Sequence, residues 1–282
     1  MRRLTDDAVN EFSNFFDVNF LKTFIPKKPK GNGKMLILAD LHFPFHNEKL
    51  LRETIAKNKD ADLLFIAGDI FDMFDMSPYR KTMYLPFKEE FGRAMRRLQE
   101  LCTHFPKVKI MLTNHDKRPY KRLYDSVLPN LLEFCHKDLL EELIGLTPNL
   151  EIIGQNALGR EIGYLAQEKN IVFTHIEKSN TDITKTVQEI HKTIKLKWEE
   201  AYRLKHYNIV MQAHNHSAGQ VWMNNTLLAQ IPCMIDISAP AFDYVFDGKA
   251  KGNPPALGYA TIQLIDGVYD PNTLQIYKFQ TY

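Results

Sequence analysis

The sequence contains few cysteines and no long apolar run. Its three cysteines, Cys102, Cys135 and Cys233, are widely spaced and form no CxxC pair, so they predict neither a disulfide framework nor a thiolate metal site. No stretch approaches the ~20 apolar residues that span a bilayer, and the first residues lack the apolar core of a signal peptide. We therefore expect a soluble protein of the reducing cytoplasm with no membrane partner.

An excess of charge of one sign is also absent. The 282 residues carry 36 Lys and Arg against 34 Asp and Glu, a formal net charge of +2. This balance excludes a strongly basic nucleic-acid-binding protein, so any basic site must be local. With 44% hydrophobic and 11% aromatic residues, the chain is long enough and apolar enough for one large α/β domain.

The first 34 residues differ from the rest. Within residues 7–24, Val9 and Phe residues at positions 12, 16, 20 and 24 have helical spacing, and a segment rich in Pro, Lys and Gly follows. We expect an amphipathic helix and linker over residues 1–34, ahead of a domain over residues 35–282. Packing of this helix on the domain is the favoured interpretation, and self-association or partner binding is the alternative.

Strand-like and helix-like segments alternate from residue 35 onward. The apolar runs 35–39, 62–67 and 108–113 are separated by helical patterns at 47–58 and 87–103, which is typical of a parallel sheet. Beyond residue 208, short strands with turn signals at 224–225 and 266–267 indicate a second sheet. The expected fold is α/β, a four-layer α/β/β/α sandwich with mixed sheets.

Polar segments typical of metal ligands follow five of the strand-like runs. They are Asp40-Leu41-His42, Gly68-Asp69, Asn114-His115-Asp116, His175 and His214-Asn215-His216. Each fragment alone is common, but all five after strands are hard to produce by chance. Because such loops gather at the carboxyl edge of a parallel sheet, the sequence predicts a hydrolytic site with two metal ions there.

The donor types define the chemistry of this predicted site. A carboxylate can bridge two cations, and Asp69 is the natural bridge because Gly68 allows a tight turn before it. Oxygen and imidazole ligands without sulfur favour two Mn²⁺ ions, with Fe or Zn as alternatives. We expect a metal-bound hydroxide as nucleophile and His115 as general acid, oriented by the adjacent Asp116.

The motifs ADLHF, AGDIFD, TNHDKR, FTHIE and QAHNHS resemble those of the calcineurin-like metallophosphoesterases. The resemblance implies the metallophosphoesterase sandwich, His115 as catalytic acid and Asp116 as its orienting group. It also implies two ligand sets that share Asp69. One set is Asp40, His42, Asp69 and His216, and the other is Asp69, Asn114, His175 and His214.

The sequence departs from the family pattern at two positions and in one motif. Thr113 and Ala213 stand where the family has glycine, which affects loop conformation more than the ligands themselves. The Asp-Arg-Gly of the protein serine/threonine phosphatases is absent after Asp69, so that branch of the superfamily is disfavoured.

Basic side chains near the motifs suggest the substrate. Arg80, Arg118 and Arg122 lie in segments that mix basic and aromatic residues, a combination that suits phosphate clamping and base stacking. The presence of these basic residues is explained equally well if they lie in the solvent-exposed first turn of an ordinary helix. We expect a phosphodiesterase, with DNA or RNA as a candidate substrate and a nuclease as one form that this activity can take. The alternatives are a phosphomonoesterase acting on a nucleotide, phosphosugar or phosphoprotein, and a non-catalytic scaffold.

Overall fold

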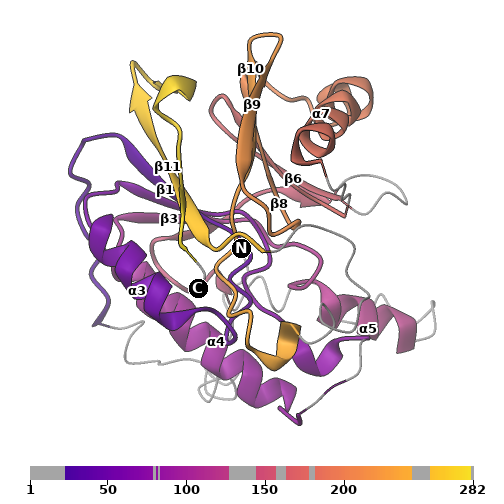
Figure 1. The fold of residues 1–282 in the computed structure, drawn as a ribbon. Coiled ribbons are helices and arrows are strands. Elements are labelled where there is room, and N and C mark those ends of the chain that lie inside the picture. Colours follow the sequence, from indigo (N-terminus) through magenta and orange to yellow (C-terminus); the bar gives the residue numbers. More distant parts are fainter. Residues whose placement is uncertain are drawn as a thin grey trace.

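In the computed structural model the described residues are 23–78, 81, 83–126, 144–156, 163–177, 182–242 and 255–280. Two β-sheets pack face to face, and helices cover the outer face of each sheet (Figure 1). The expected four-layer α/β/β/α arrangement with mixed sheets is confirmed. The N-terminal helix expected within residues 1–34 falls almost entirely outside the described residues, so it stays a prediction.

The first sheet is built on a parallel core. Strands β1 (Lys34–Leu38), β2 (Leu63–Ile66), β3 (Lys107–Ile110) and β4 (Leu150–Ile152) pair in parallel in this order. The antiparallel strand β11 (Gly258–Ile265) pairs with β1 on the other side. Two short strands, β12 (Val268–Tyr269) and β13 (Gln275–Lys278), also pair with β11. All four parallel strands therefore end at the same edge.

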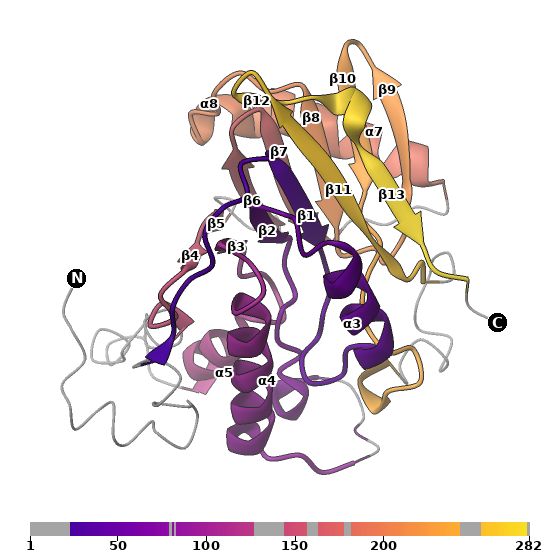
Figure 2. The same cartoon turned by 90° about the vertical axis from the view of Figure 1, so that its left-hand side faces the viewer.

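Helices α3 (Glu48–Lys57), α4 (Phe87–Cys102) and α5 (Arg118–Ser126) lie on the side of the first sheet that faces away from the second sheet (Figure 2). The Asn47 side chain caps α3 by accepting from the Leu50 N–H at 3.1 Å. The predicted helices at 47–58 and 87–103 are confirmed to within one residue at each end. Three 3₁₀ turns, Phe74–Met76, Pro240–Phe242 and Pro271–Thr273, lie in the loops.

The second sheet has the order β5-β6-β7-β8-β10-β9. Its strands are β5 (Gln155–Asn156), β6 (Gly163–Glu168), β7 (Ile171–Ile176), β8 (Ile209–Ala213), β9 (Gly219–Met223) and β10 (Thr226–Gln230). Strand β8 pairs in parallel with β7 and with β10, whereas the pairs β5–β6, β6–β7 and β9–β10 are antiparallel. The turns at 224–225 and 266–267 join β9 to β10 and β11 to β12, but only β9 and β10 belong to the second sheet; the assignment of β11 and β12 to that sheet was wrong, because β11 pairs with β1 of the first.

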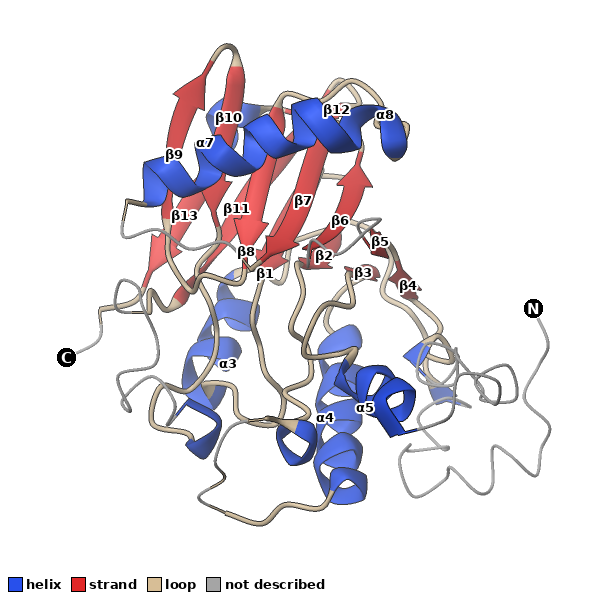
Figure 3. Cartoon of the chain, turned by 90° about the vertical axis from the view of Figure 1, so that its right-hand side faces the viewer, coloured by secondary structure: helices blue, strands red, loops and turns tan. Residues whose placement is uncertain are grey.

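Helix α7 (Ile183–Thr193) crosses the outer face of the second sheet (Figure 3). The Asp182 side chain caps it by accepting from the Thr184 N–H at 2.9 Å. In the sequence, apolar residues at positions 183, 187, 190, 194 and 198 have the spacing of one continuous helix over residues 180–206, but the helix does not run on evenly. It passes into a π-helical turn, Ile194–Trp198, and ends in the short α8, Glu199–Ala201. Within the described residues, no helix is long and apolar enough to cross a membrane.

Side chains that alternate along each strand point to opposite faces of its sheet, so one strand contributes to two apolar layers. In β1, Leu36 and Leu38 pack against α4, whereas Met35 and Ile37 face the second sheet. The Phe65 and Phe173 rings stack between the sheets with centroids 3.7 Å apart. A third cluster, under α7, contains residues of β7 and β8. This packing fixes both sheets, so their carboxyl edges meet at one place.

Candidate metal centre

The loops that follow β1 and β2 are joined by backbone hydrogen bonds beyond the ends of the strands. The Asp40 N–H donates to the Gly68 carbonyl at 3.1 Å, and the His42 N–H donates to the Asp69 carbonyl at 2.9 Å. The Phe43 N–H donates to the Ile70 carbonyl at 2.7 Å. These bonds hold the side chains of Asp40, His42 and Asp69 at one edge of the sheet.

The second sheet brings its histidines to the same edge. His175 lies near the end of β7, and its Nδ1–H donates to the Ala67 carbonyl at 3.1 Å, so Nε2 is the ring nitrogen that points to the site, 3.2 Å from His214 Nδ1. The His214 N–H, after β8, lies 3.2 Å from both carboxylate oxygens of Asp40. The site is therefore built across the junction of the two sheets.

Asp69 lies at the centre of these side chains. Its Oδ1 accepts from the Thr113 hydroxyl at 2.6 Å and from the His115 N–H at 3.2 Å. Its Oδ2 lies 3.1 Å from His175 Nε2, 3.8 Å from His42 Nε2 and 3.9 Å from His115 Nε2. One carboxylate oxygen thus faces three imidazole rings from three different loops.

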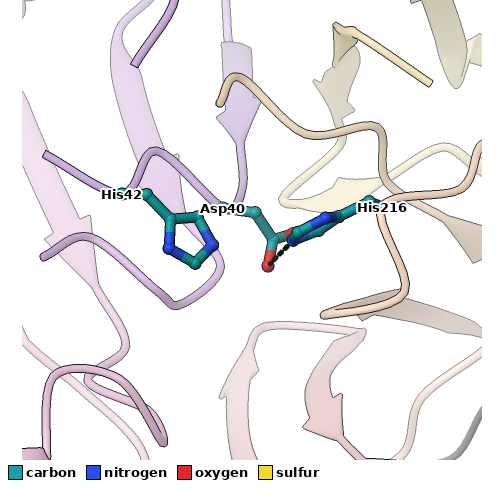
Figure 4. Close-up of side chains that lie close together, drawn as sticks. All are labelled: Asp40, His42 and His216. Atoms are coloured by element: carbon teal, nitrogen blue, oxygen red, sulfur yellow. Dashed lines mark ion pairs between the residues drawn. The ribbon is translucent and has the colours of Figure 1, made fainter. Parts of the chain in front are cut away.

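Two compact groups of ligating atoms lie at this edge of the sheets. One consists of Asp40, His42 and His216, in which the His216 Nε2 is 3.6 Å from the Asp40 carboxylate (Figure 4). The other consists of Asp69, His175 and His214. These two groups contain six of the seven predicted ligands, and Asp69 falls in the second group only.

Unpaired buried atoms show that the site suits cations. Among the described residues, His42 Nε2 and Asn114 Oδ1 are buried without a hydrogen-bond partner. His42 Nδ1–H donates to the Asp72 carboxylate at 2.9 Å, so Nε2 carries the lone pair that faces the site. A buried acceptor left unpaired costs about 1–3 kcal/mol, which a metal ion would offset. Asn114, the seventh predicted ligand, therefore also offers a free oxygen.

The ligand-bearing loops are strained. Asp40, His42, Asp69, His214 and His216 have φ values of 50°, 50°, 44°, 79° and 50°. Non-glycine residues rarely adopt positive φ, and such strain is concentrated at functional sites. Five of the seven predicted ligands share this conformation, which indicates that the loops are shaped for the site rather than for stability.

Gly68 is required by both its conformation and its surroundings. Its φ is +96°, and a Cβ there would lie 2.4 Å from His175 Nδ1 and 2.6 Å from Thr113 Cγ2. The tight turn expected at this glycine is confirmed. No side chain fits between Asp69 and the two loops that support it.

Replacing Gly68 with alanine is expected to lower the free energy of unfolding by about 3 kcal/mol or more, since left-handed strain adds to overpacking. Gly267→Ala is the matched control, because φ is +85° there and nothing lies within 4 Å of the added Cβ. The control should cost only about 1–2 kcal/mol. Urea unfolding of both variants measures the difference, and equal costs would contradict the crowding at Gly68.

The charges of the site are strongly coupled. Burial disfavours the cation of His175, but the Asp69 carboxylate outweighs it and raises the His175 pKa to about 9. Burial and the neighbouring His175 lower the pKa of His214 to about 3. Burial alone would raise the pKa of Asp69, but the surrounding imidazoles hold it well below its usual value. Asp69 is therefore an anion at neutral pH.

The carboxylate beside the His115 ring belongs to Asp72, not to Asp116. The His115 Nδ1–H donates to the Asp72 carbonyl at 3.0 Å, and Nδ1 lies 3.6 Å from the Asp72 carboxylate. His42, Asp72 and His115 form a third compact group of ligating atoms. The sequence interpretation missed Asp72, although its position three residues after Asp69 was a signal that could have been used.

Asp116 has a different environment from the one expected. Its carboxylate accepts from the N–H groups of Ile70 at 3.0 Å, Phe71 at 2.8 Å and Thr113 at 2.8 Å. Burial and the charge of Asp69 raise its pKa to about 7. Asp116 thus ties the Asp69 loop to the Thr113 loop. Asp116 therefore lies at the site, but its carboxylate does not contact the His115 ring.

The three candidate arginines differ in position. Arg118 is 14% exposed and donates to the Asp72 carbonyl at 2.8 Å and to His115 Nε2 at 3.0 Å. Arg122 is exposed, and its Nε donates to the Met76 carbonyl at 3.2 Å. Arg80 lies outside the described residues. Arg118 is therefore the candidate that the structure brings to the site.

Residues 33–246 match the model of the family described as calcineurin-like phosphoesterase. The chain belongs to this family. The match covers most of the described residues and includes every predicted ligand. No curated protein matches the sequence.

Several solved structures align with most of this chain at low identity and low TM-score. A Vps29 mutant from Entamoeba histolytica is 9% identical, with 88% of this chain and 99% of that chain covered and a TM-score of 0.38. A predicted phosphoesterase from Streptococcus pneumoniae is 11% identical, with 88% and 98% covered and a TM-score of 0.33. A novel archaeal phosphodiesterase is 10% identical, with 86% and 99% covered and a TM-score of 0.39. At these values the similarities say nothing about the substrate of this chain.

Proposed function

We propose that this member of the calcineurin-like phosphoesterase family is a hydrolase that uses two divalent metal ions and prefers phosphodiesters. The observation that supports this most strongly is the position of Asp69, whose carboxylate belongs to one ligand group and faces three imidazoles, one of them His42 of the other group. A scaffold would not need strained loops or unpaired buried acceptors at this point.

The residues that would hold the two ions follow from the two groups. One ion would be held by Asp40, His42 and His216. The other ion would be held by Asn114, His175 and His214. Asp69 would contact both ions. When bound, the ions supply activated water and Lewis-acid polarisation of the phosphoryl oxygens. The donor set of oxygen and imidazole nitrogen favours Mn²⁺, with Fe or Zn as alternatives.

His115 would donate the proton to the leaving oxygen. In the structure its Nδ1–H is held by the Asp72 carbonyl, so Nε2 is the atom that faces the site. Burial, together with the charge of Arg118, lowers the His115 pKa although the Asp69 carboxylate opposes this. An anionic substrate would draw the guanidinium of Arg118 away from Nε2 and favour protonation there.

Asp72 would orient the rings of two histidines, His42 and His115. Its carboxylate fixes the tautomer of His42, and its carbonyl fixes that of His115. The hydrogen bonds of Asp116 suit it to a different task, which is to keep the Asp69 and Thr113 loops together. We therefore transfer the orienting role from Asp116 to Asp72.

Arg118 supports the preference for a polyanionic substrate. Its guanidinium donates to the Asp72 carbonyl and to His115 Nε2, which places a cation beside the proposed catalytic acid. Arg122, and Arg80 in the sequence, would extend this cationic surface along DNA or RNA. A nuclease is the form of phosphodiesterase that such an extended surface suits best.

A substrate panel tests this proposal. Metal-stripped protein, reloaded with Mn²⁺, is offered a chromogenic diester, the matching monoester, and single- and double-stranded nucleic acid. We expect hydrolysis of the diester and of nucleic acid, with a kcat/KM for the diester at least ~10-fold above that for the monoester. Faster monoester turnover would identify a phosphomonoesterase, and inactivity on every substrate with metal bound would favour a scaffold.

A further inference from the structure

A cavity separate from the metal centre lies on the outer face of the second sheet. Its volume is about 570 Å³, and it is lined by the end of α7, the π-helical turn, the segment before β8 and the β9–β10 turn. The five residues of β8 separate Asn208 at this cavity from His214 at the metal site, a length of about 17 Å at ~3.3 Å per residue. The two sites are therefore at opposite ends of one strand.

A buried histidine without a hydrogen-bond partner lines this cavity. His191 is 4% exposed, and among the described residues neither of its ring nitrogens has a partner. Its ring makes only an edge contact with Tyr207, at a centroid distance of 6.3 Å. Buried polar groups are nearly always paired, so an unpaired imidazole facing a cavity indicates a missing hydrogen-bonding ligand. The adjacent π-helical turn is a rare feature that is frequent at functional sites.

The charge of the lining is positive. Among the described residues that line this cavity, Glu199 is the only carboxylate, and it is already paired, since Lys195 Nζ lies 2.9 Å and the Tyr207 hydroxyl 3.3 Å from it. Lys192 lines the same cavity and adds a second cation, and His206 offers another imidazole. An anion would therefore be attracted here more strongly than a neutral or cationic molecule.

The remaining lining residues suit a ligand that is larger than a simple anion. Asn208, Asn224 and Asn225 present carboxamides, which can bond the polar edge of a heterocycle. Leu196, which is 83% exposed, and Met223 supply apolar contact surface. The volume is within the range of pockets that bind small organic ligands, and an inorganic phosphate would leave most of it empty.

We propose that this cavity is a binding site for an organic phosphate of the size of a nucleoside monophosphate. The phosphate lies against Lys192, the lining cation that remains once Lys195 is paired with Glu199, and the heterocycle pairs with His191 and the carboxamides of the β9–β10 turn. This inference goes beyond the proposed hydrolysis, because it assigns a ligand to a surface that contains none of the predicted metal ligands.

Calorimetric titration of the full chain in EDTA tests the proposal without relying on catalysis. The probes are AMP, GMP, CMP and UMP, with adenosine and inorganic phosphate as comparison ligands. We expect at least one nucleotide to bind at least ~10-fold more tightly than either comparison ligand, a difference of about 1.4 kcal/mol. Absence of nucleotide binding, or equal affinity for adenosine or phosphate, would overturn it.

Four variants locate the binding. Lys192→Glu, an exposed change that leaves the core intact, and His191→Phe, which keeps a ring but removes the nitrogens, should each raise the nucleotide Kd at least ~10-fold. Lys185→Glu is the matched charge control on the same helix, and Asp69→Asn alters only the metal centre. Both should leave the Kd within ~2-fold. Loss of binding in Asp69→Asn, or unchanged binding in Lys192→Glu and His191→Phe, would contradict the assignment.

Discussion

Replacing Asp69 with asparagine is expected to reduce Mn²⁺-dependent hydrolysis at least ~10³-fold, because the protein loses the one carboxylate placed to contact both ions. The asparagine Oδ1 can still accept from the Thr113 hydroxyl and the His115 N–H, as the Asp69 Oδ1 does. The fold should therefore persist. The amide nitrogen would replace the oxygen that lies 3.1 Å from His175 Nε2.

Metal content and activity of the Asp69→Asn protein are measured together. We expect fewer than two Mn²⁺ per chain after gel filtration, against two for the wild type. Asp75→Asn is the matched control, since Asp75 lies in the same loop but pairs with Lys81 at 3.4 Å. A variant that binds two ions and retains activity would rule out Asp69 as the bridge.

Replacing His115 with glutamine is expected to have an effect that depends on the leaving group. For an alkyl or nucleoside leaving group, which needs a proton, kcat should fall by ~10²–10⁴-fold. For p-nitrophenolate, a stable anion that needs no proton, the decrease should be less than ~10-fold. The reason is geometric: His115 Nε2 faces the Asp69 carboxylate at 3.9 Å but is not one of the residues assigned to hold the ions.

This comparison separates two roles for His115. The group formed by His42, Asp72 and His115 leaves open a direct contact between His115 and a metal ion. If His115 were a ligand, His115→Gln would lose metal and would slow both substrates equally. His104→Gln, a histidine at the end of α4 and far from the ligands, is the control for nonspecific loss of activity.

Much of the site could be predicted because the ligands follow strands. Asp40, Asp69 and Asn114 come after β1, β2 and β3, whose parallel order is evident from the alternation of apolar runs and helical patterns. Parallel strands present their carboxyl ends at one edge, so adjacency in space follows from sequence order. The capped start of α7 and both tight turns were likewise local signals.

The rest of the site depends on contacts between loops, which no local pattern encodes. Asp72 reaches His42 because its N–H donates to the Phe43 carbonyl at 3.0 Å, a bond between two loops. Thr113 departs from the glycine of the family pattern, yet its hydroxyl accepts from the Asp69 N–H at 2.7 Å and donates to the Asp69 carboxylate. Because Asp116 is adjacent to His115 in the sequence, it was predicted to be the partner of the His115 ring. The loop that follows Asp69 instead brings Asp72 next to that ring.

The cavity on the outer face of the second sheet also required the three-dimensional structure. The residues of the π-helical turn have the same apolar spacing as an ordinary helix, so the sequence predicted one continuous element. The cavity brings this turn together with the loop between β9 and β10, which lies about 30 residues further along the chain. His191 therefore looked like an ordinary residue of a helix until its surroundings were known.

The central claim is that one carboxylate joins two metal ions in this protein. A crystal of the Mn²⁺-loaded chain, with anomalous data collected at the manganese edge, tests it most directly. We predict two anomalous peaks, one beside Asp40, His42 and His216 and the other beside Asn114, His175 and His214, with the Asp69 carboxylate in contact with both. A single peak, or two peaks of which Asp69 contacts only one, would contradict the account.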